Sequence, residues 1–301
     1  MYADLRLAMR QLRKAPGFAL TAVLTLALAI GANAVVFSVL NALVLRPLNV
    51  PHSENLFMLQ RVYSQGDSPS QSYPDYRDLR DRNHSFDSLM SYDITGAVGL
   101  DTGSKNPSVV WPYLISGNYF DSLGVQPYLG RFLHASDEHG KNSVPYIVLS
   151  YAYWRNHFNS DPAAVGRVVQ INKHPYTIVG VAPAAFRGTE LFFAPDLWAP
   201  ILDLPQIGGW DPVEERGDHF TWVAGHLKPG VSPAAAASDL NTIAASLAKS
   251  NPKEDELLKF SLARPGLVGD TLGKPARAFM AGLMLLSGLI LLAACANLGS
   301  V

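Results

Sequence analysis

The residue types best suited to chemistry stand close together in one short stretch. His134, Asp137, Glu138 and His139 bring two imidazoles and two carboxylates into six consecutive positions, and zinc takes ligands of these types in proteins. A metal site also needs a fixed geometry, which spacing alone does not show. We interpret the stretch as a solvated polar loop and expect neither a metal ion nor another cofactor in the chain.

A second group of ionisable residues is mainly acidic. Its members are Asp211, Glu214, Glu215, Asp218 and His219. Their spacing matches no catalytic motif, and we interpret them as an exposed acidic loop.

Residues 269–275 are the nearest approach to a phosphate-binding loop. The stretch is one residue short between Gly269 and Gly273, and after Lys274 it has Pro275 where the magnesium-binding hydroxyl belongs. We therefore expect that this chain does not hydrolyse ATP itself. The sequence also lacks a Gly-x-Ser-x-Gly elbow, a His-Glu-x-x-His motif and a dinucleotide-binding glycine pattern. An envelope enzyme is thus the least favoured class of function.

Two long apolar runs enclose the rest of the chain. Only 16% of the 301 residues are charged, against about 25% in typical soluble domains, and residues 15–45 and 278–301 carry no charge at all. A membrane-spanning helix needs about 20 apolar residues. We predict membrane spans over residues 18–45 and 278–301, an amphipathic helix at the cytoplasmic interface over 1–17, and a folded domain over 46–277.

The charges beside the first run predict its orientation. Arg6, Arg10, Arg13 and Lys14 precede the run, whereas only Arg46 follows it immediately. Because cytoplasmic flanks are rich in Lys and Arg, we expect a cytoplasmic N-terminus in a bacterial inner membrane and a periplasmic central domain. A cleavable signal peptide is the alternative, but the apolar sequence continues for eleven residues past its possible cleavage site at 32–34.

The charge and cysteine content of the chain restrict its partners and compartment. Residues 46–277 carry 20 basic and 24 acidic side chains, so we expect no binding of nucleic acid. The single cysteine, Cys295, lies in the second apolar run and excludes an intrachain disulfide. An exported domain without disulfides suits the bacterial envelope.

Small residues recur along one face of each apolar run. They are Ala27, Gly31, Ala34, Ser38 and Asn41 in the first run and Ala281, Gly288 and Cys295 in the second. Small residues let helices approach closely in lipid, so we predict that both helices pack against other helices through these faces.

The central region alternates short strands with helices. We expect strands at 56–63, 109–115, 146–149, 168–171, 176–181, 220–227 and 259–263. We expect helices at 74–82, 118–123, 150–158 and 233–249. Asn172 and Lys173 are expected to form the turn of a hairpin. Because the strands and helices do not alternate strictly, the pattern predicts an α+β domain.

Several stretches carry a resemblance to a known family. Residues 15–33, 39–48, 72–80, 117–125, 148–154 and 166–183 resemble MacB/FtsX-type ABC transporter permeases, and in particular a subgroup known as acidobacterial duplicated permeases. The resemblance implies a periplasmic core of two lobes on membrane stalks, a separate ABC ATPase, and pairing as a homodimer or with a second permease half. Since members of the family continue through further spans, the resemblance also implies that this chain is an N-terminal fragment.

Two classes of function follow from this layout. The first is an inner-membrane permease subunit of a transport, efflux or mechanotransmission system. The alternative is a two-span sensor, in which an extracytoplasmic domain binds a ligand and signals inward.

Overall fold

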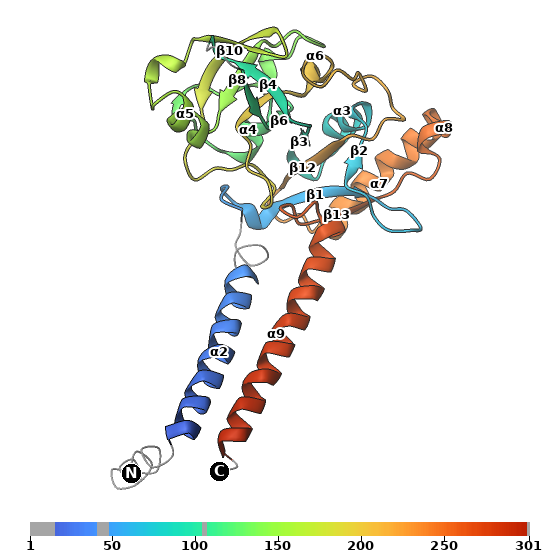
Figure 1. Cartoon of the computed structure of the whole chain (residues 1–301). Coiled ribbons are helices and arrows are strands. Elements are labelled where there is room, and N and C mark those ends of the chain that lie inside the picture. Colours follow the sequence, from blue (N-terminus) through green and yellow to red (C-terminus); the bar gives the residue numbers. More distant parts are fainter. Residues whose placement is uncertain (1–15, 41–47, 104–106, 300–301) are drawn as a thin grey trace. The chain divides into compact units, whose positions relative to one another are not determined.

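The computed structural model describes residues 16–40, 48–103 and 107–299 (Figure 1). The chain forms two compact units. One comprises Met1–Arg46 with Lys274–Val301, and the other comprises Pro47–Gly273.

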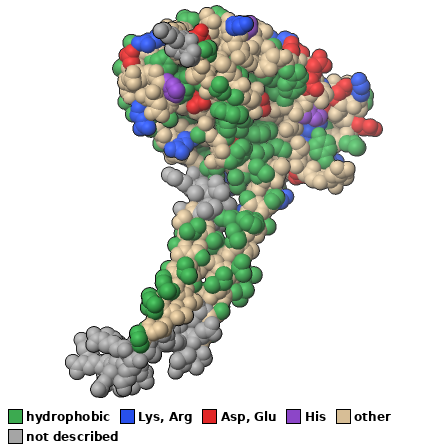
Figure 2. Space-filling model, viewed as in Figure 1, with side chains coloured by type: hydrophobic (Ala, Val, Ile, Leu, Met, Phe, Trp, Pro, Cys, Tyr) green, Lys and Arg blue, Asp and Glu red, His purple; other side chains and the backbone are tan. Residues whose placement is uncertain are grey.

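The first unit contains two long apolar helices, α2 (Pro16–Leu40) and most of α9 (Asp270–Gly299). Segments Ala19–Ser38 and Asp270–Ala293 have the length and composition to cross a membrane, and only 6% and 11% of them are buried, so neither resembles the core helix of a soluble domain. Figure 2 shows hydrophobic side chains along both helices, while most charged side chains in view lie on the second unit. The amphipathic helix predicted over 1–17 falls outside the described residues, except for its last two positions.

The strands described in the second unit join into one thirteen-stranded sheet. They are β1 (Leu56–Arg61), β2 (Ser70–Gln71), β3 (Phe86–Ile94), β4 (Val98–Asp101), β5 (Ser108–Val110), β6 (Pro112–Ile115), β7 (Leu129–Gly130), β8 (Tyr146–Leu149), β9 (Val168–Ile171), β10 (His174–Val181), β11 (Leu197–Pro200), β12 (Thr221–Leu227) and β13 (Phe260–Ala263). The order is β13-β1-β12-β3-β6-β11-β8-β10-β9-β4-β5, with β2 beside β12 and β7 beside β10.

The sheet curls back on itself at one end. In the strand order, β6 and β5 stand at the two ends of the run β6-β11-β8-β10-β9-β4-β5. In the chain, however, only Trp111 separates β5 from β6. Strand β3 pairs with β6, and β4 pairs with β5. The segment β3–β4 and the segment β5–β6 are therefore the two arms of one long bent hairpin. Most neighbours are antiparallel, whereas β8–β10 and β6–β11 are parallel.

Helices cover the sheet and its edge. They are α3 (Tyr73–Arg82), α4 (Tyr119–Leu123), α5 (Tyr151–His157), α6 (Leu204–Gly208), α7 (Pro233–Ser250) and α8 (Pro252–Asp255), with short 3₁₀ turns at Ser53–Asn55, Ala135–Asp137, Pro162–Ala164 and Ile201–Asp203. The hydroxyls of Ser72, Ser150 and Ser232 accept backbone N–H groups in the first turns of α3, α5 and α7. Such caps satisfy N–H groups that have no partner within the helix.

Strand β13 is an edge strand whose outer side is partly occupied. The amide of Asn241 on α7 accepts the N–H of Phe260 at 2.9 Å and donates to the carbonyl of Phe260 at 2.9 Å. The Asn241 side chain thus makes the two bonds that a neighbouring strand would make at this residue.

The buried apolar residues form one cluster on each face of the sheet. Successive strand residues point to opposite faces, and accordingly Leu114 belongs to one cluster while Tyr113 and Ile115 belong to the other. The same division separates Leu149 from Val148. Because both faces are covered, the central strands β6 and β11 are buried at every position.

The predicted α+β class is confirmed. Strands β9 and β10 form the expected hairpin, and Asn172 and Lys173 at its turn have positive φ angles of 47° and 74°, as a type I′ turn requires. The strand expected at 109–115 is divided at Trp111, and the nine-residue β3 was not predicted. Since all the described strands belong to one sheet, any division into two lobes runs across a continuous sheet.

Gly180 lies where two backbones approach too closely for a side chain. A Cβ atom at this position would lie 2.1 Å from the carbonyl oxygen of Arg131. We expect Gly180→Ala to lower the free energy of unfolding by about 1–3 kcal/mol, the usual cost of overpacking, in a denaturant titration of the full chain in detergent. Gly217→Ala is the matched control, because a Cβ there meets nothing within 4 Å. Equal stability of the two variants would contradict this account.

Candidate functional site

The second unit is joined to the apolar helices at two points in the chain, which we call the entry segment (residues 48–55) and the exit segment (residues 264–269). The entry segment is tied to the domain by one of its own side chains and by one from β12. The Asn49 amide donates to the carbonyl oxygen of Ala185 at 2.9 Å. The two ring nitrogens of His226, on β12, lie 2.9 Å from the Ser122 carbonyl oxygen and 3.1 Å from that of Pro51.

The contacts of His226 depend on its protonation. A carbonyl oxygen only accepts hydrogen bonds, and a neutral imidazole has a single N–H group. Both contacts are therefore hydrogen bonds only when the His226 ring carries two protons. In that form His226 fastens the entry segment to α4 and β12 together.

A cleft of about 680 Å³ opens beside the entry segment. Its walls include Pro51, His52, Asp87, Asp121 and His226. The volume is in the range of small-molecule pockets, and a molecule bound there would touch both the entry segment and the residue that holds it.

Arg264 connects the exit segment to the entry segment. Its guanidinium donates to the carbonyl oxygens of Glu54 and, at 3.3 Å, of Leu56. It also lies over the ring of Phe57, 4.1 Å from the centroid. The two ends of the domain are therefore held to each other by one side chain.

The exit segment is held to the sheet by Glu190. This side chain is 2% exposed. Its carboxyl accepts the Tyr92 hydroxyl at 2.9 Å and the Val268 N–H at 2.8 Å, and the N–H of Leu191 donates to the Gly266 carbonyl at 2.7 Å. Burial raises the pKa of Glu190 to about 7, against the lowering effect of these donors.

The backbone of the exit segment is strained next to Glu190. Val268 has a φ of 50°, which is a rare conformation for a β-branched residue and costs about 1–3 kcal/mol. Nearby, Gln60 is fully buried, and neither its amide nitrogen nor its amide oxygen has a hydrogen-bond partner. A Cβ on Gly269 would lie 2.8 Å from the Gln60 amide nitrogen. Gly269 also has a φ of 59°, so a residue with a side chain would be strained at this position.

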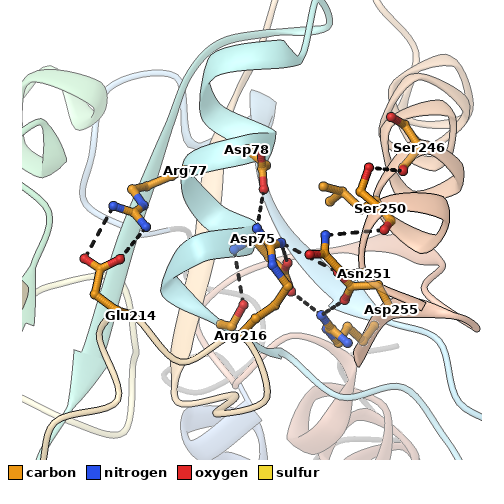
Figure 3. A network of polar contacts seen from close by, with 12 residues as sticks. Asp75, Arg77, Asp78, Glu214, Arg216, Ser246, Ser250, Asn251 and Asp255 are labelled. Atoms are coloured by element: carbon orange, nitrogen blue, oxygen red, sulfur yellow. Dashed lines mark hydrogen bonds and ion pairs between the residues drawn. The ribbon is translucent and has the colours of Figure 1, made fainter. Parts of the chain in front are cut away.

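A buried charge cluster fixes the elements at the β13 end of the sheet (Figure 3). Arg61 on β1 pairs with Asp75 on α3 and, at 3.2 Å, with Asp255 on α8. Arg216 pairs with Asp75 and, at 2.6 Å, with Asp78. Burial, and then repulsion from Asp75, raise the pKa of Asp255. Two guanidinium groups thus hold three carboxylates and join β1, α3, α8 and the loop that carries Arg216.

Three of the four residues considered for metal chemistry make structural contacts instead, and the fourth, His139, is exposed. His134 contacts Asp121 at 2.9 Å, the Asp137 carboxylate binds the Arg131 guanidinium at 2.7 and 3.1 Å, and Glu138 accepts the Gly117 N–H at 2.8 Å. In the described part of the chain, no three His, Cys, Asp or Glu side chains are grouped to hold a metal ion.

The acidic stretch 211–219 is exposed only in part. Asp211, Glu214 and Glu215 are exposed, whereas Asp218 and His219 are half-buried. Sequence reasoning missed Arg216, which points into the buried cluster. A lone basic residue among acidic neighbours was the available signal.

The small residues predicted to pack against other helices are placed as follows. Ala27, Gly31, Ala34 and Ser38 are exposed on α2, Ala281 and Cys295 are exposed and Gly288 is half-buried on α9, and Asn41 lies outside the described residues. Contact between α2 and α9 uses another face, where the Asn33 amide donates to the Ser287 carbonyl at 3.2 Å. Asn33 was the sequence signal for this contact, because a polar residue inside an apolar run usually faces a partner. Packing of the small-residue faces against further helices remains a prediction.

Comparison with known families decides which class of protein carries this arrangement. Residues 19–243 of the 301 match the family described as the MacB-like periplasmic core domain. The chain belongs to this family. As a MacB-like ABC permease it has a permease role, and permeases of this family work with ABC ATPases. The match therefore favours the permease over the two-span sensor.

Solved structures agree in fold. A domain of a permease protein from Porphyromonas gingivalis matches with a TM-score of 0.53 and 15% identity, covering 72% of this chain and 93% of that one. The periplasmic region of MacB from Actinobacillus actinomycetemcomitans matches with a TM-score of 0.50 and 16% identity, covering 70% of this chain and 89% of that one. No curated protein matches the sequence. The MacB-like assignment thus rests on the family match, and the structures support the fold.

Proposed function

We propose that this MacB-like chain transmits work in the inner membrane, where a separate ABC ATPase drives movements that the membrane helices carry to a periplasmic domain. The observation that carries the proposal is that the exit segment is bonded both to the sheet and to the entry segment. Helix α9 begins at Asp270, directly after the exit segment, and Glu190 and Arg264 bond that segment to the sheet and to the entry segment. We therefore expect a displacement of the exit segment to be transmitted to the sheet through these bonds.

The proposal includes the topology and the assembly expected from the sequence. Residues 18–45 and 278–301 cross the membrane, the N-terminus is cytoplasmic, and residues 46–277 are periplasmic. The chain pairs as a homodimer or with a second permease half and contacts membrane lipid through its apolar helices. Membership of the duplicated subgroup is part of the same proposal.

Labelling in spheroplasts tests the topology. Cys295→Ser removes the native cysteine, and Leu257→Cys places a new one at a side chain that is 85% exposed in the domain. We expect a membrane-impermeant maleimide to label this cysteine in intact spheroplasts, whereas Asp4→Cys in the same background is labelled only after permeabilisation. The reverse pattern would overturn the topology.

An insertion tests the coupling. Four Gly-Ser residues are inserted after Gly269 of the complete permease, which is produced with its ATPase in efflux-deficient cells and scored for survival on a panel of drugs and antimicrobial peptides. We expect the insertion to abolish protection because it places a flexible joint before α9. The same insertion after Gly66 is the control, since Gly66 lies in the loop between β1 and β2 and a Cβ there meets nothing within 4 Å. Full protection by the Gly269 insertion would reject the proposal.

A further inference from the structure

A single carboxyl group joins the sheet to the exit segment. One oxygen of Glu190 accepts the hydroxyl of Tyr92 on β3, and the other accepts the backbone N–H of Val268, two residues before α9. Glu190 is almost fully buried, so water cannot replace either bond while the exit segment is in place. Opening of the segment must break the bond to Val268 and expose the carboxyl.

The exit segment has the backbone of a hinge. Gly266, Val268 and Gly269 all have positive φ angles, of 109°, 50° and 59°. Glycine adopts such angles readily, but a β-branched residue does not. Val268 therefore keeps this conformation only while its surroundings hold it, and release from Glu190 would let the segment relax.

Burial favours the neutral form of Glu190, whereas its hydrogen-bond donors favour the ionised form. Tyr92 on β3, Tyr113 on β6 and Tyr119 on α4 surround it, and burial raises the pKa of all three phenols, so they stay neutral. From the exit segment it receives only backbone N–H donors, of Val268 and Gly266, and the next ionisable residue along the chain is the acidic Asp270. Burial raises the pKa of Glu190 to about 7. An ionised carboxylate at this position is stabilised less by its present partners than it would be by water.

We propose that Glu190 is a proton-controlled latch, which holds the exit segment against the sheet when protonated and lets it open when ionised. The proton passes to bulk water on opening and returns from it on closing, so the switch needs no other reactant. The consequence for transport rests on the proposed function: acidification would fasten α9 to the domain, and neutral or alkaline pH would loosen it.

Hydrogen exchange of the full chain in detergent micelles tests the latch without any ATPase or substrate. The Val268 N–H reports on it directly, because Glu190 is its acceptor. With a pKa of about 7 when closed and about 4.5 when open to water, the opening constant should rise about tenfold per pH unit between these values and about 300-fold in all. We expect exchange of peptides covering residues 264–270, corrected for intrinsic exchange, to follow this rise.

Three variants make the result specific. Glu190→Gln keeps the size and the acceptor of the side chain, and should remove the pH dependence. Tyr92→Phe removes one donor to the carboxylate, and should move the midpoint to higher pH. Glu138→Gln is the matched control, because Glu138 also accepts a backbone N–H at 2.8 Å but lies away from the exit segment, and it should leave the wild-type profile unchanged.

Two outcomes would overturn the latch. One is corrected exchange at residues 264–270 that does not vary with pH in the wild-type chain. The other is an equal pH dependence in Glu190→Gln and wild type. Failure of the coupling proposal would appear in the survival assay with the Gly269 insertion, so the two failures are distinguishable.

Discussion

Arg61→Met should lower the free energy of unfolding by about 3–5 kcal/mol, the range observed when one partner is removed from a buried ion pair. The substitution leaves Asp75 and Asp255 buried with only Arg216 to offset them. Their mutual repulsion in a medium of low dielectric constant, rather than the lost packing of Arg61, accounts for most of the effect. Denaturant titration of the full chain in detergent, followed by tryptophan fluorescence, measures it.

Arg77→Met is the matched control for this prediction. Arg77 also lies on α3 and also binds a carboxylate, at 2.7 Å from Glu214, but both side chains are exposed to water. Exposed pairs contribute about 1 kcal/mol or less. If Arg61→Met lost no more stability than Arg77→Met, the cluster in Figure 3 would have no special role in holding the domain together.

The free energy of unfolding should increase as the pH falls from 8 to 5. Burial raises the pKa of Asp93, Glu190 and Asp203 to about 7 in each case. Because these folded-state values exceed the unfolded ones, the stability that each group contributes is fully present below about pH 4 and is lost as the pH rises towards 7. A difference of about 3 pKa units corresponds to about 4 kcal/mol for one group. Denaturant titrations at pH 5, 6, 7 and 8 measure the slope.

A triple variant provides the control for the pH dependence. Asp93→Asn, Glu190→Gln and Asp203→Asn together remove the three titrations while keeping side chains of similar size. We expect this variant to show a nearly flat stability between pH 5 and 8. A wild-type chain that is most stable at pH 8, or a triple variant that keeps the wild-type slope, would contradict the prediction.

Features set by neighbouring residues could be predicted from the sequence. Helices over 74–82, 150–158 and 233–249 were predicted, and the structure shows Ser72, Ser150 and Ser232 at their caps, because a short hydroxyl reaches the N–H groups of the next turn. The hairpin at Asn172 depends on four consecutive residues in the same way. The family resemblance, carried by stretches of 7 to 19 residues, was likewise readable and was confirmed by the match over residues 19–243.

Features set by distant residues could not be predicted. Strand β3 was missed because polar Ser91 and Asp93 interrupt its apolar pattern, yet Ser91 is buried, with its hydroxyl 2.5 Å from that of Thr221 on β12. The contacts of the entry and exit segments are made by Glu190, His226 and Arg264, which lie far apart in the sequence. No spacing rule relates such residues, and only the curled sheet places them at the two ends of the domain.

The contact of Asn241 with β13 has a consequence for the resistance of the domain to aggregation. An open strand edge invites a strand from another molecule, and this is a common route to aggregation. At Phe260 that route is closed, because the Asn241 amide already occupies both backbone groups. In the crowded periplasm proposed for this domain, an edge that its own helix covers as soon as the domain folds would limit pairing with other chains.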